Sequence, residues 1–122
     1  MWVSFNPNPR AARVGDCAVR AISKACGLTW EQAYINLTLQ GFIDGDLPSA
    51  NNVWGAYLRK HGFTKNIPPL TNGTVECFAN DHPRGVYVIA VNGHVVTVVN
   101  GDWFDTWDSG GEVPLYYWAK EN

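Results

Sequence analysis

The stretch Val86-Tyr87-Val88-Ile89-Ala90-Val91-Asn92-Gly93-His94-Val95-Val96-Thr97-Val98-Val99-Asn100-Gly101 decides the fold class. Two runs rich in β-branched residues are each followed by Asn-Gly, which is the strongest short hairpin signal because both central residues of that turn need positive φ. We therefore predict strands over 86–91 and 94–99. Similar runs predict further strands over 103–108 and, more weakly, 113–118. The second half of the chain is thus expected to form an antiparallel meander.

The first half of the chain has the spacing of helices instead. Four helices are expected, each with a capping residue before it: 17–26 after Asp16, a second from Thr29 to Gly41, a third from Ser49 to Gly62, and a short one after Thr74. A chain of 122 residues is the size of one domain. We predict a single α+β domain over 1–122, with N-terminal helices packed on a C-terminal antiparallel β-sheet.

Composition narrows the classes of function. Eleven acidic and nine basic residues give a formal charge of −2, so no basic field attracts nucleic acid. The longest apolar run, 86–91, is far shorter than the roughly 20 residues of a membrane helix. Residues 1–10 lack the basic start and apolar stretch of a signal peptide, and three cysteines form no closed disulfide set. We expect a soluble cytoplasmic protein that binds neither nucleic acid nor membrane.

Cys17 and His94 are the candidate reactive residues. Cys17 follows Gly15-Asp16 in the first turn of its helix, where unpaired N–H groups and the helix dipole favour a thiolate. His94 is a polar residue at the entrance of an almost wholly apolar strand, where it could take the thiol proton. An arbitrary cysteine is more often a buried core residue, and a histidine after a turn is more often on the surface. Placement favours the reactive interpretation for both.

The acid that would orient His94 is left open between Asp105 and Asp108. A two-residue turn at Asn100-Gly101 pairs His94 with Trp107 and puts Asp105 on the same face. A three-residue turn would instead set Asp108 directly opposite His94. Since side chains alternate between the two faces of a strand, only one of the two acids can serve.

The segments Gly-Asp-Cys-x-x-Arg-Ala at 15–21 and Asp-Thr-Trp-Asp at 105–108 resemble those of small phage- and bacteria-encoded papain-like cysteine hydrolases, over roughly residues 6–118. The resemblance implies a papain-like fold and a Cys17–His94–Asp108 triad, because in that class the orienting residue commonly precedes a Ser, as in Asp108-Ser109. It also implies cleavage of a peptide or amide bond of a peptide or protein substrate, through a thioester, without a cofactor or metal.

An oxyanion intermediate needs two donors. The backbone N–H of Cys17 is the first. Papain uses a Gln ahead of its Cys, whereas no Gln precedes Cys17, so Asn6, Asn8 and Arg13 are the candidates for the second. Two alternatives remain: an acyltransferase or deamidase of transglutaminase-like type with the same triad, and a catalytically inactive papain-like binding module. The sequence leaves the oligomeric state open.

Overall fold

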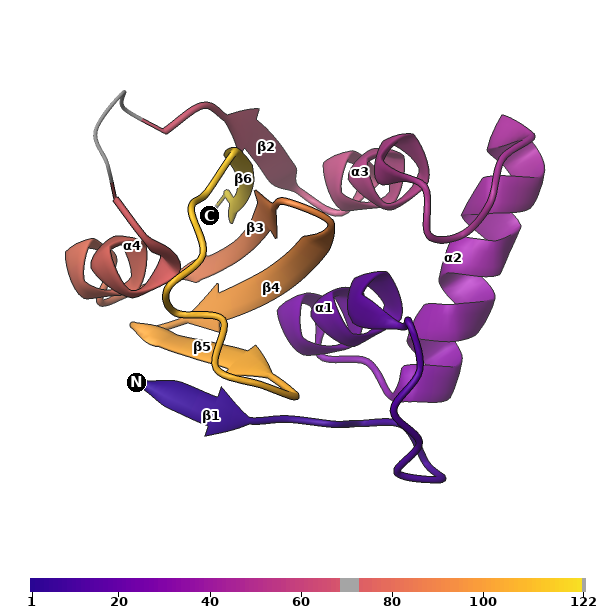
Figure 1. Cartoon of the computed structure of the whole chain (residues 1–122). Coiled ribbons are helices and arrows are strands. Elements are labelled where there is room, and N and C mark those ends of the chain that lie inside the picture. The colour runs from indigo at the N-terminus through magenta and orange to yellow at the C-terminus, as the bar shows by residue number, and fades with distance from the viewer. Residues whose placement is uncertain (69–72, 122) are drawn as a thin grey trace.

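A computed structural model describes residues 1–68 and 73–121 of the chain. Within these residues the elements follow in the order β1 (Trp2–Ser4), α1 (Cys17–Cys26), α2 (Trp30–Asp44), α3 (Asn51–Lys60), β2 (Phe63–Asn66), α4 (Val75–Asp81), β3 (Val86–Val91), β4 (His94–Val99), β5 (Asp102–Asp105) and β6 (Tyr116–Lys120). The predicted α+β class is confirmed (Figure 1).

The strands form one sheet in the order β1-β5-β4-β3-β6-β2. The predicted meander is confirmed for β3, β4 and β5, which are antiparallel neighbours. The Asn100-Gly101 turn behaves as expected, since its two residues have φ of 50° and 84°. In the Asn92-Gly93 turn only Gly93 has a positive φ, of 67°. Val99 pairs with Asp102, so the turn between β4 and β5 contains two residues. This register decides where the acids of β5 lie.

The sheet differs from the expectation at its edges. β1 pairs in parallel with β5, so the sheet is mixed rather than purely antiparallel. β6 pairs with β3 on the far side of the meander instead of extending it beside β5. β1 and β2 were not predicted from the sequence, because strands of three and four residues are too short to show an alternating pattern.

The helices match the sequence closely at their starts. α1 has the predicted bounds, with Gly27 in the left-handed conformation after it, and Thr29 and Gln32 form the expected capping box of α2. However, α2 continues beyond Gly41, because this glycine serves a close approach rather than a helix end. A Cβ at position 41 would lie 2.6 Å from the carbonyl oxygen of Asp46. α3 begins after Ala50 instead of Ser49.

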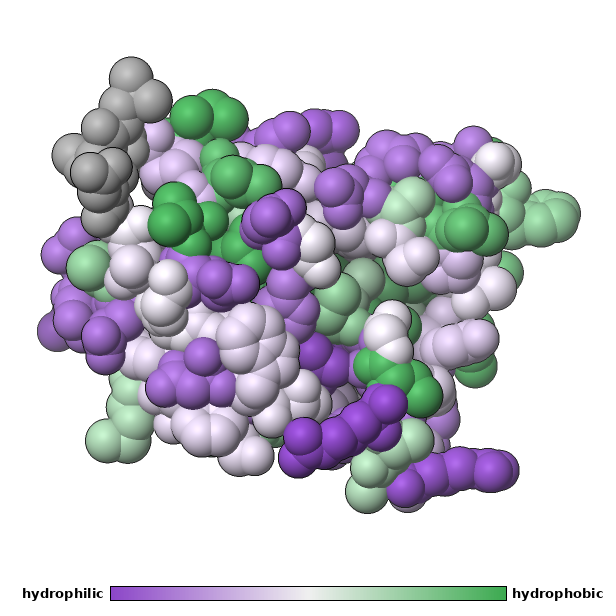
Figure 2. All heavy atoms as spheres, viewed as in Figure 1, coloured by the Kyte–Doolittle hydropathy of each residue, from purple (hydrophilic) through white to green (hydrophobic). Residues whose placement is uncertain are grey.

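α2 is the outermost helix, and only one side of it is buried. Ala33 and Leu37 are fully buried, while Tyr34 is about half exposed. Several large apolar side chains of α2 face outward, namely Ile35, Leu39, Phe42 and Ile43. Apolar atoms accordingly gather on the right-hand edge of the molecule in Figure 2, where α2 lies. α2 therefore supports α1 and α3 with its inner face alone.

Two apolar clusters cover the two faces of the sheet. One joins α1, α2 and α3 to Val88, Ala90 and Val95. The other joins α4 to Ile89, Val96 and Trp103. β4 begins and the antiparallel β5 ends at the same end of the sheet. The first residue of α1 and the first residue of β4 line one cavity, so the helix N-terminus lies at this end of the sheet.

Candidate active site

The N-terminus of α1 presents Cys17 as its first residue, half-buried at the end of the sheet. The prediction that Asp16 caps this helix through its side chain is wrong, since no side-chain capping bond forms there. The Asp16 carboxylate instead accepts from Arg20 and from the indole of Trp30. The backbone N–H of Cys17 has no acceptor among the described residues, so it is free to bind an incoming oxygen.

His94 is held by a carboxylate from the neighbouring strand. Its Nε2 lies 2.5 Å from Oδ2 of Asp105, a side chain that is fully buried. Because Nε2 is engaged with this carboxylate, Nδ1 is the ring nitrogen left for the thiol. The Trp107 ring lies 5.1 Å from the imidazole and partly shields it from water.

Asp105 is bound on both oxygens. Its Oδ1 accepts from the Arg20 guanidinium at 3.1 Å and from the backbone N–H of Thr106 at 2.8 Å. Its Oδ2 accepts from the Ser109 hydroxyl at 2.7 Å in addition to His94. A buried carboxylate stays ionised only when charged or polar groups compensate it in this way. The orientation of Asp105 is therefore fixed by four donors.

The preference for Asp108 as the third residue is corrected by this geometry. The structure brings Asp105 to His94, and Oδ1 of Asp108 accepts from the Trp103 indole at 2.9 Å and from the Gly110 N–H at 3.0 Å. The physical reason is the length of the turn between β4 and β5. With two residues in the turn, the pairing of the two strands brings Asp105 close to His94. Asp108 instead closes the loop that follows β5.

A buried ion network lies behind the acid. Arg20 bridges two carboxylates, with Nη1 at 2.5 Å from Asp16 and Nη2 at 3.1 Å from Asp105. All three side chains are at least nine-tenths buried. Arg20 is thus a structural anchor for Asp16. Its second bond to Asp105 was not anticipated, and it ties α1 to the end of β5.

The pKa values of the three groups shift in a concerted way. Burial alone would raise the pKa of Cys17, but its interactions with His94 and with the Val95 N–H outweigh burial and lower that pKa. Burial would lower the pKa of His94, yet Asp105 and Cys17 together raise it to about 9. Burial also opposes ionisation of Asp105, whose pKa is nevertheless lowered, mainly by His94 and Ser109. This combination favours a thiolate beside an imidazolium.

The two reactive side chains open into a cavity of about 250 Å³. Its walls come from α3, the β3–β4 hairpin and the start of β6, and include Ser49, Asn51, Trp54, Leu115 and Tyr116. Trp54 and Tyr116 stack at 6.3 Å with nearly parallel rings. Sequence reasoning did not place these residues at the site, because the apolar spacing of α3 indicates its buried face but not which part of the sheet that face meets.

The candidate second oxyanion donors are not brought to this cavity. None of Asn6, Asn8 and Arg13 is among the described residues that line it. The Asn6 amide donates to the carbonyl of Ala12, and Asn8 accepts from the N–H of Arg10, so both side chains order their own loop. Asn51 does line the cavity, and its Oδ1 accepts from the Trp54 indole at 3.2 Å. The amide nitrogen of Asn51 is therefore one side-chain donor on the cavity wall, beside the hydroxyls of Ser49 and Tyr116.

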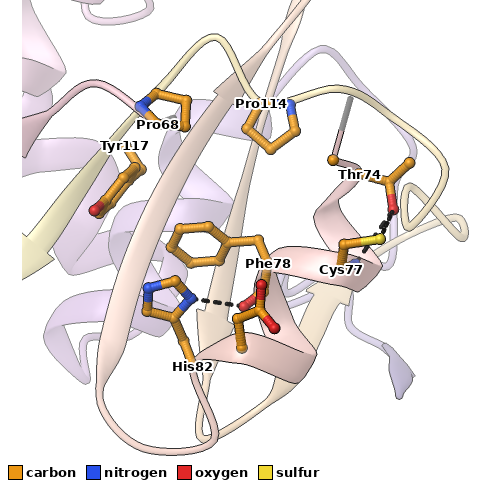
Figure 3. A pocket seen from close by; sticks show the side chains of 9 residues that line it. Pro68, Thr74, Cys77, Phe78, His82, Pro114 and Tyr117 are labelled. Carbon is orange, nitrogen blue, oxygen red and sulfur yellow. Dashed lines mark hydrogen bonds between the residues drawn. The ribbon is translucent and has the colours of Figure 1, made fainter. Parts of the chain in front are cut away.

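The other two cysteines lie elsewhere. Cys26 packs against the core on the helical side of the sheet, and burial raises its pKa. Cys77 is exposed beside a cavity of about 250 Å³ between α4 and β6, shown in Figure 3. Its thiol accepts from the Thr74 hydroxyl, while His82 at the other end of that cavity bonds the Phe78 carbonyl. Among the residues that the structure describes, neither cysteine therefore has a histidine partner.

The described part of the chain offers neither a metal-binding cluster nor a membrane-spanning helix. Residues 1–68 and 73–121 contain no group of three or more His, Cys, Asp or Glu side chains that could hold a metal ion. Across the same residues, no helix is both long and apolar enough to cross a bilayer.

Comparisons of the chain with protein-family models, curated proteins and solved structures gave no match.

Proposed function

We propose that this protein is a cysteine hydrolase that cleaves a peptide or amide bond through a thioester, with Cys17, His94 and Asp105 as its catalytic residues. The observation that carries the proposal is that a helix-terminal thiol and an imidazole line one open cavity, while a buried carboxylate binds the imidazole from behind. The order of these groups along the chain, with the thiol at a helix N-terminus before the imidazole and the acid, resembles that of a papain-like enzyme and supports the proposal. The proposal thus keeps the papain-like interpretation with a different acid.

The chemistry follows from the positions of the groups. The Cys17 thiolate attacks the carbonyl carbon and forms a C–S bond, and the carbonyl oxygen takes the negative charge near the Cys17 N–H. We assign the Asn51 amide as the second donor to that oxygen. The His94 imidazolium then gives its Nδ1 proton to the leaving amine as the C–N bond breaks. Water, deprotonated by the neutral His94, releases the acid from the thioester.

Asp105 keeps His94 in the required state. Its bond to Nε2 leaves Nδ1 facing the thiol, and its charge stabilises the imidazolium that exists before the amine leaves. The pKa of His94, raised to about 9, means that the ring is protonated at neutral pH. The resting enzyme is therefore the thiolate–imidazolium pair, ready for attack.

The first test is the pH dependence of alkylation by iodoacetamide, followed for each cysteine by mass spectrometry. We expect Cys17 to react at a pH well below the ordinary thiol value of about 8.5, faster than Cys26 and Cys77. In a His94→Gln variant this advantage should disappear. If Cys17 reacts like an ordinary thiol in both proteins, the enzyme proposal fails and a binding module takes its place.

A second test identifies the reaction. The protein and its Cys17→Ser variant are incubated with a peptide library and a primary amine, and the products are analysed by mass spectrometry. New chain ends indicate hydrolysis, whereas a glutamine converted to glutamate indicates deamidation and an added amine indicates acyl transfer. We expect new chain ends that are absent with the variant. Either other product would assign the same triad to the alternative reaction class.

A further inference from the structure

A second cavity adjoins the candidate active site along α3. It measures about 320 Å³ and is lined by residues of α3, β2 and β6, namely Asn51, Asn52, Gly55, Arg59, Lys65, Tyr116 and Trp118. We call it the basic cavity. Asn51 and Tyr116 line both this cavity and the one that contains Cys17. A ligand in the active site can therefore extend into the basic cavity without leaving the protein surface.

Two cations face the basic cavity, and each lies against an aromatic ring. The Lys65 ammonium lies 4.3 Å from the centre of the Tyr116 ring, and the Arg59 guanidinium lies 5.2 Å from that of Trp118. Neither forms an ion pair with a described residue. Such contacts hold the cationic groups in place while leaving N–H donors for a ligand. An anion would thus meet two positive charges that no acid of this part of the chain neutralises.

The fold fixes the two cations beside each other. Arg59 lies two turns after Asn51 and Asn52 on α3, on the face that meets β6, and Lys65 on β2 pairs with Trp118 on β6. Figure 1 shows β2 and α3 side by side. Gly55 permits this close packing, because a Cβ there would lie 3.0 Å from the Trp118 ring.

We propose that the basic cavity is a substrate subsite for a carboxylate carried within about two residues of the bond that Cys17 attacks. This rests on the proposed function. The short reach is inferred because Tyr116 lines both cavities and its ring contacts Lys65, while each residue of an extended peptide spans about 3.3–3.6 Å. The carboxylate comes either from an acidic side chain or from a peptide C-terminus, and both present the same planar anion to Arg59.

The first arm of the test places the acid on the acyl side. The reagents are acetyl-dipeptidyl chloromethyl ketones, which alkylate Cys17 as the C–S bond forms and chloride leaves. Glu or Gln is placed at the first or at the second residue of the dipeptide. Labelling of Cys17 is followed by mass spectrometry, and each rate is divided by the iodoacetamide rate of the same protein. We expect the Glu reagent to react about fivefold faster than the Gln reagent, as two exposed ion pairs would give, and less so in 0.5 M salt.

The second arm places the carboxylate on the leaving side. Tetra-alanine and its C-terminal amide are compared as protectors of Cys17 against iodoacetamide. Better protection by the free acid would assign the subsite to a peptide C-terminus, whereas a preference in the first arm alone would assign it to an acidic side chain. Both outcomes support a carboxylate subsite. Equal rates and equal protection in the two arms would overturn it.

Variants link the preference to the two cations. The double variant Arg59→Gln/Lys65→Gln should lose the preference, and Arg59→Glu/Lys65→Glu should favour a Lys reagent instead. Lys60→Gln is the matched control, because Lys60 is also on α3 but donates to Gln40; it should keep the wild-type preference. If Cys17 is alkylated at low pH, as the proposed function expects, but shows no preference for the charged reagent, only the subsite is refuted. An ordinary thiol pKa at Cys17 refutes the proposed function.

Discussion

Replacing Asp105 with Asn removes the charge that stabilises the His94 imidazolium while keeping the size of the side chain. His94 has a pKa of about 9 in the protein, against 6.5 for a free histidine. This difference corresponds to about 3 kcal/mol in favour of the protonated ring. Asp105 contributes to it by a hydrogen bond and by charge, and Cys17 contributes in the same two ways. We therefore expect Asp105→Asn to lower the pKa of His94 by about one to two pH units.

The assay is an NMR titration of protein labelled with ¹³C at the histidine Cε1. The chain has three histidines, and the signal that disappears in His94→Gln identifies His94. Asp108→Asn is the matched control, because this carboxylate bonds Trp103 and Gly110 instead of the imidazole. It should leave the pKa of His94 unchanged. Circular dichroism confirms that both variants remain folded.

Two results would refute the assignment of Asp105. One is an Asp105→Asn variant in which the pKa of His94 stays near 9. The other is an Asp108→Asn variant in which it falls as far as in Asp105→Asn. The change also affects Cys17, since an imidazolium that deprotonates at a lower pH stabilises the thiolate less and should raise the pKa of the thiol. Iodoacetamide labelling of Asp105→Asn should therefore need a higher pH than labelling of the wild type.

Three further results are expected. Arg20→Lys should reduce the free energy of unfolding in urea by about 3 kcal/mol, because a single ammonium cannot bridge both buried carboxylates; an effect no larger than that of exposed Arg59→Lys would contradict this. The raised pKa of His94 adds stability that is complete below pH 6.5 and disappears as the pH rises through about 9. The difference in free energy of unfolding between wild type and His94→Gln, measured in urea, should therefore shrink over that range. Gly110→Ala should lower stability by about 1–3 kcal/mol, since its Cβ would lie 2.6 Å from the Trp103 ring, whereas Gly111→Ala, with nothing within 4 Å, should be tolerated in thermal unfolding.

The elements that frame the site could be predicted because each depends on local signals. A capping glycine fixes the end of α1, and two Asn-Gly turns fix the hairpins that bring β4 and β5 together. The two-residue turn also favoured Asp105 on geometric grounds. Asp108 was preferred because Asp108-Ser109 resembles a family pattern. The hydrogen bond from the Trp103 indole to Asp108 could not be predicted from sequence spacing.

The lining of the cavity could not be predicted for a different reason. The loop before Cys17 is near that residue in sequence, which made Asn6, Asn8 and Arg13 the natural oxyanion candidates. In the structure the Asn6 and Asn8 side chains bond within the loop, and the cavity wall is formed by α3. Whether a helix distant in sequence packs over a site depends on long-range contacts. Asn51 could not be identified before those contacts were known.

The charges of the site alternate in sign along one connected path. Asp16 binds Arg20, Arg20 binds Asp105, Asp105 binds His94, and His94 faces Cys17. Burying any one of these ions alone would be unfavourable, but each has a neighbour of opposite charge. The stabilisation of the thiolate should therefore decline with distance along the path. Loss of His94 should raise the pKa of Cys17 most, loss of Asp105 less, and loss of Arg20 least, so the order of the three effects tests the path itself.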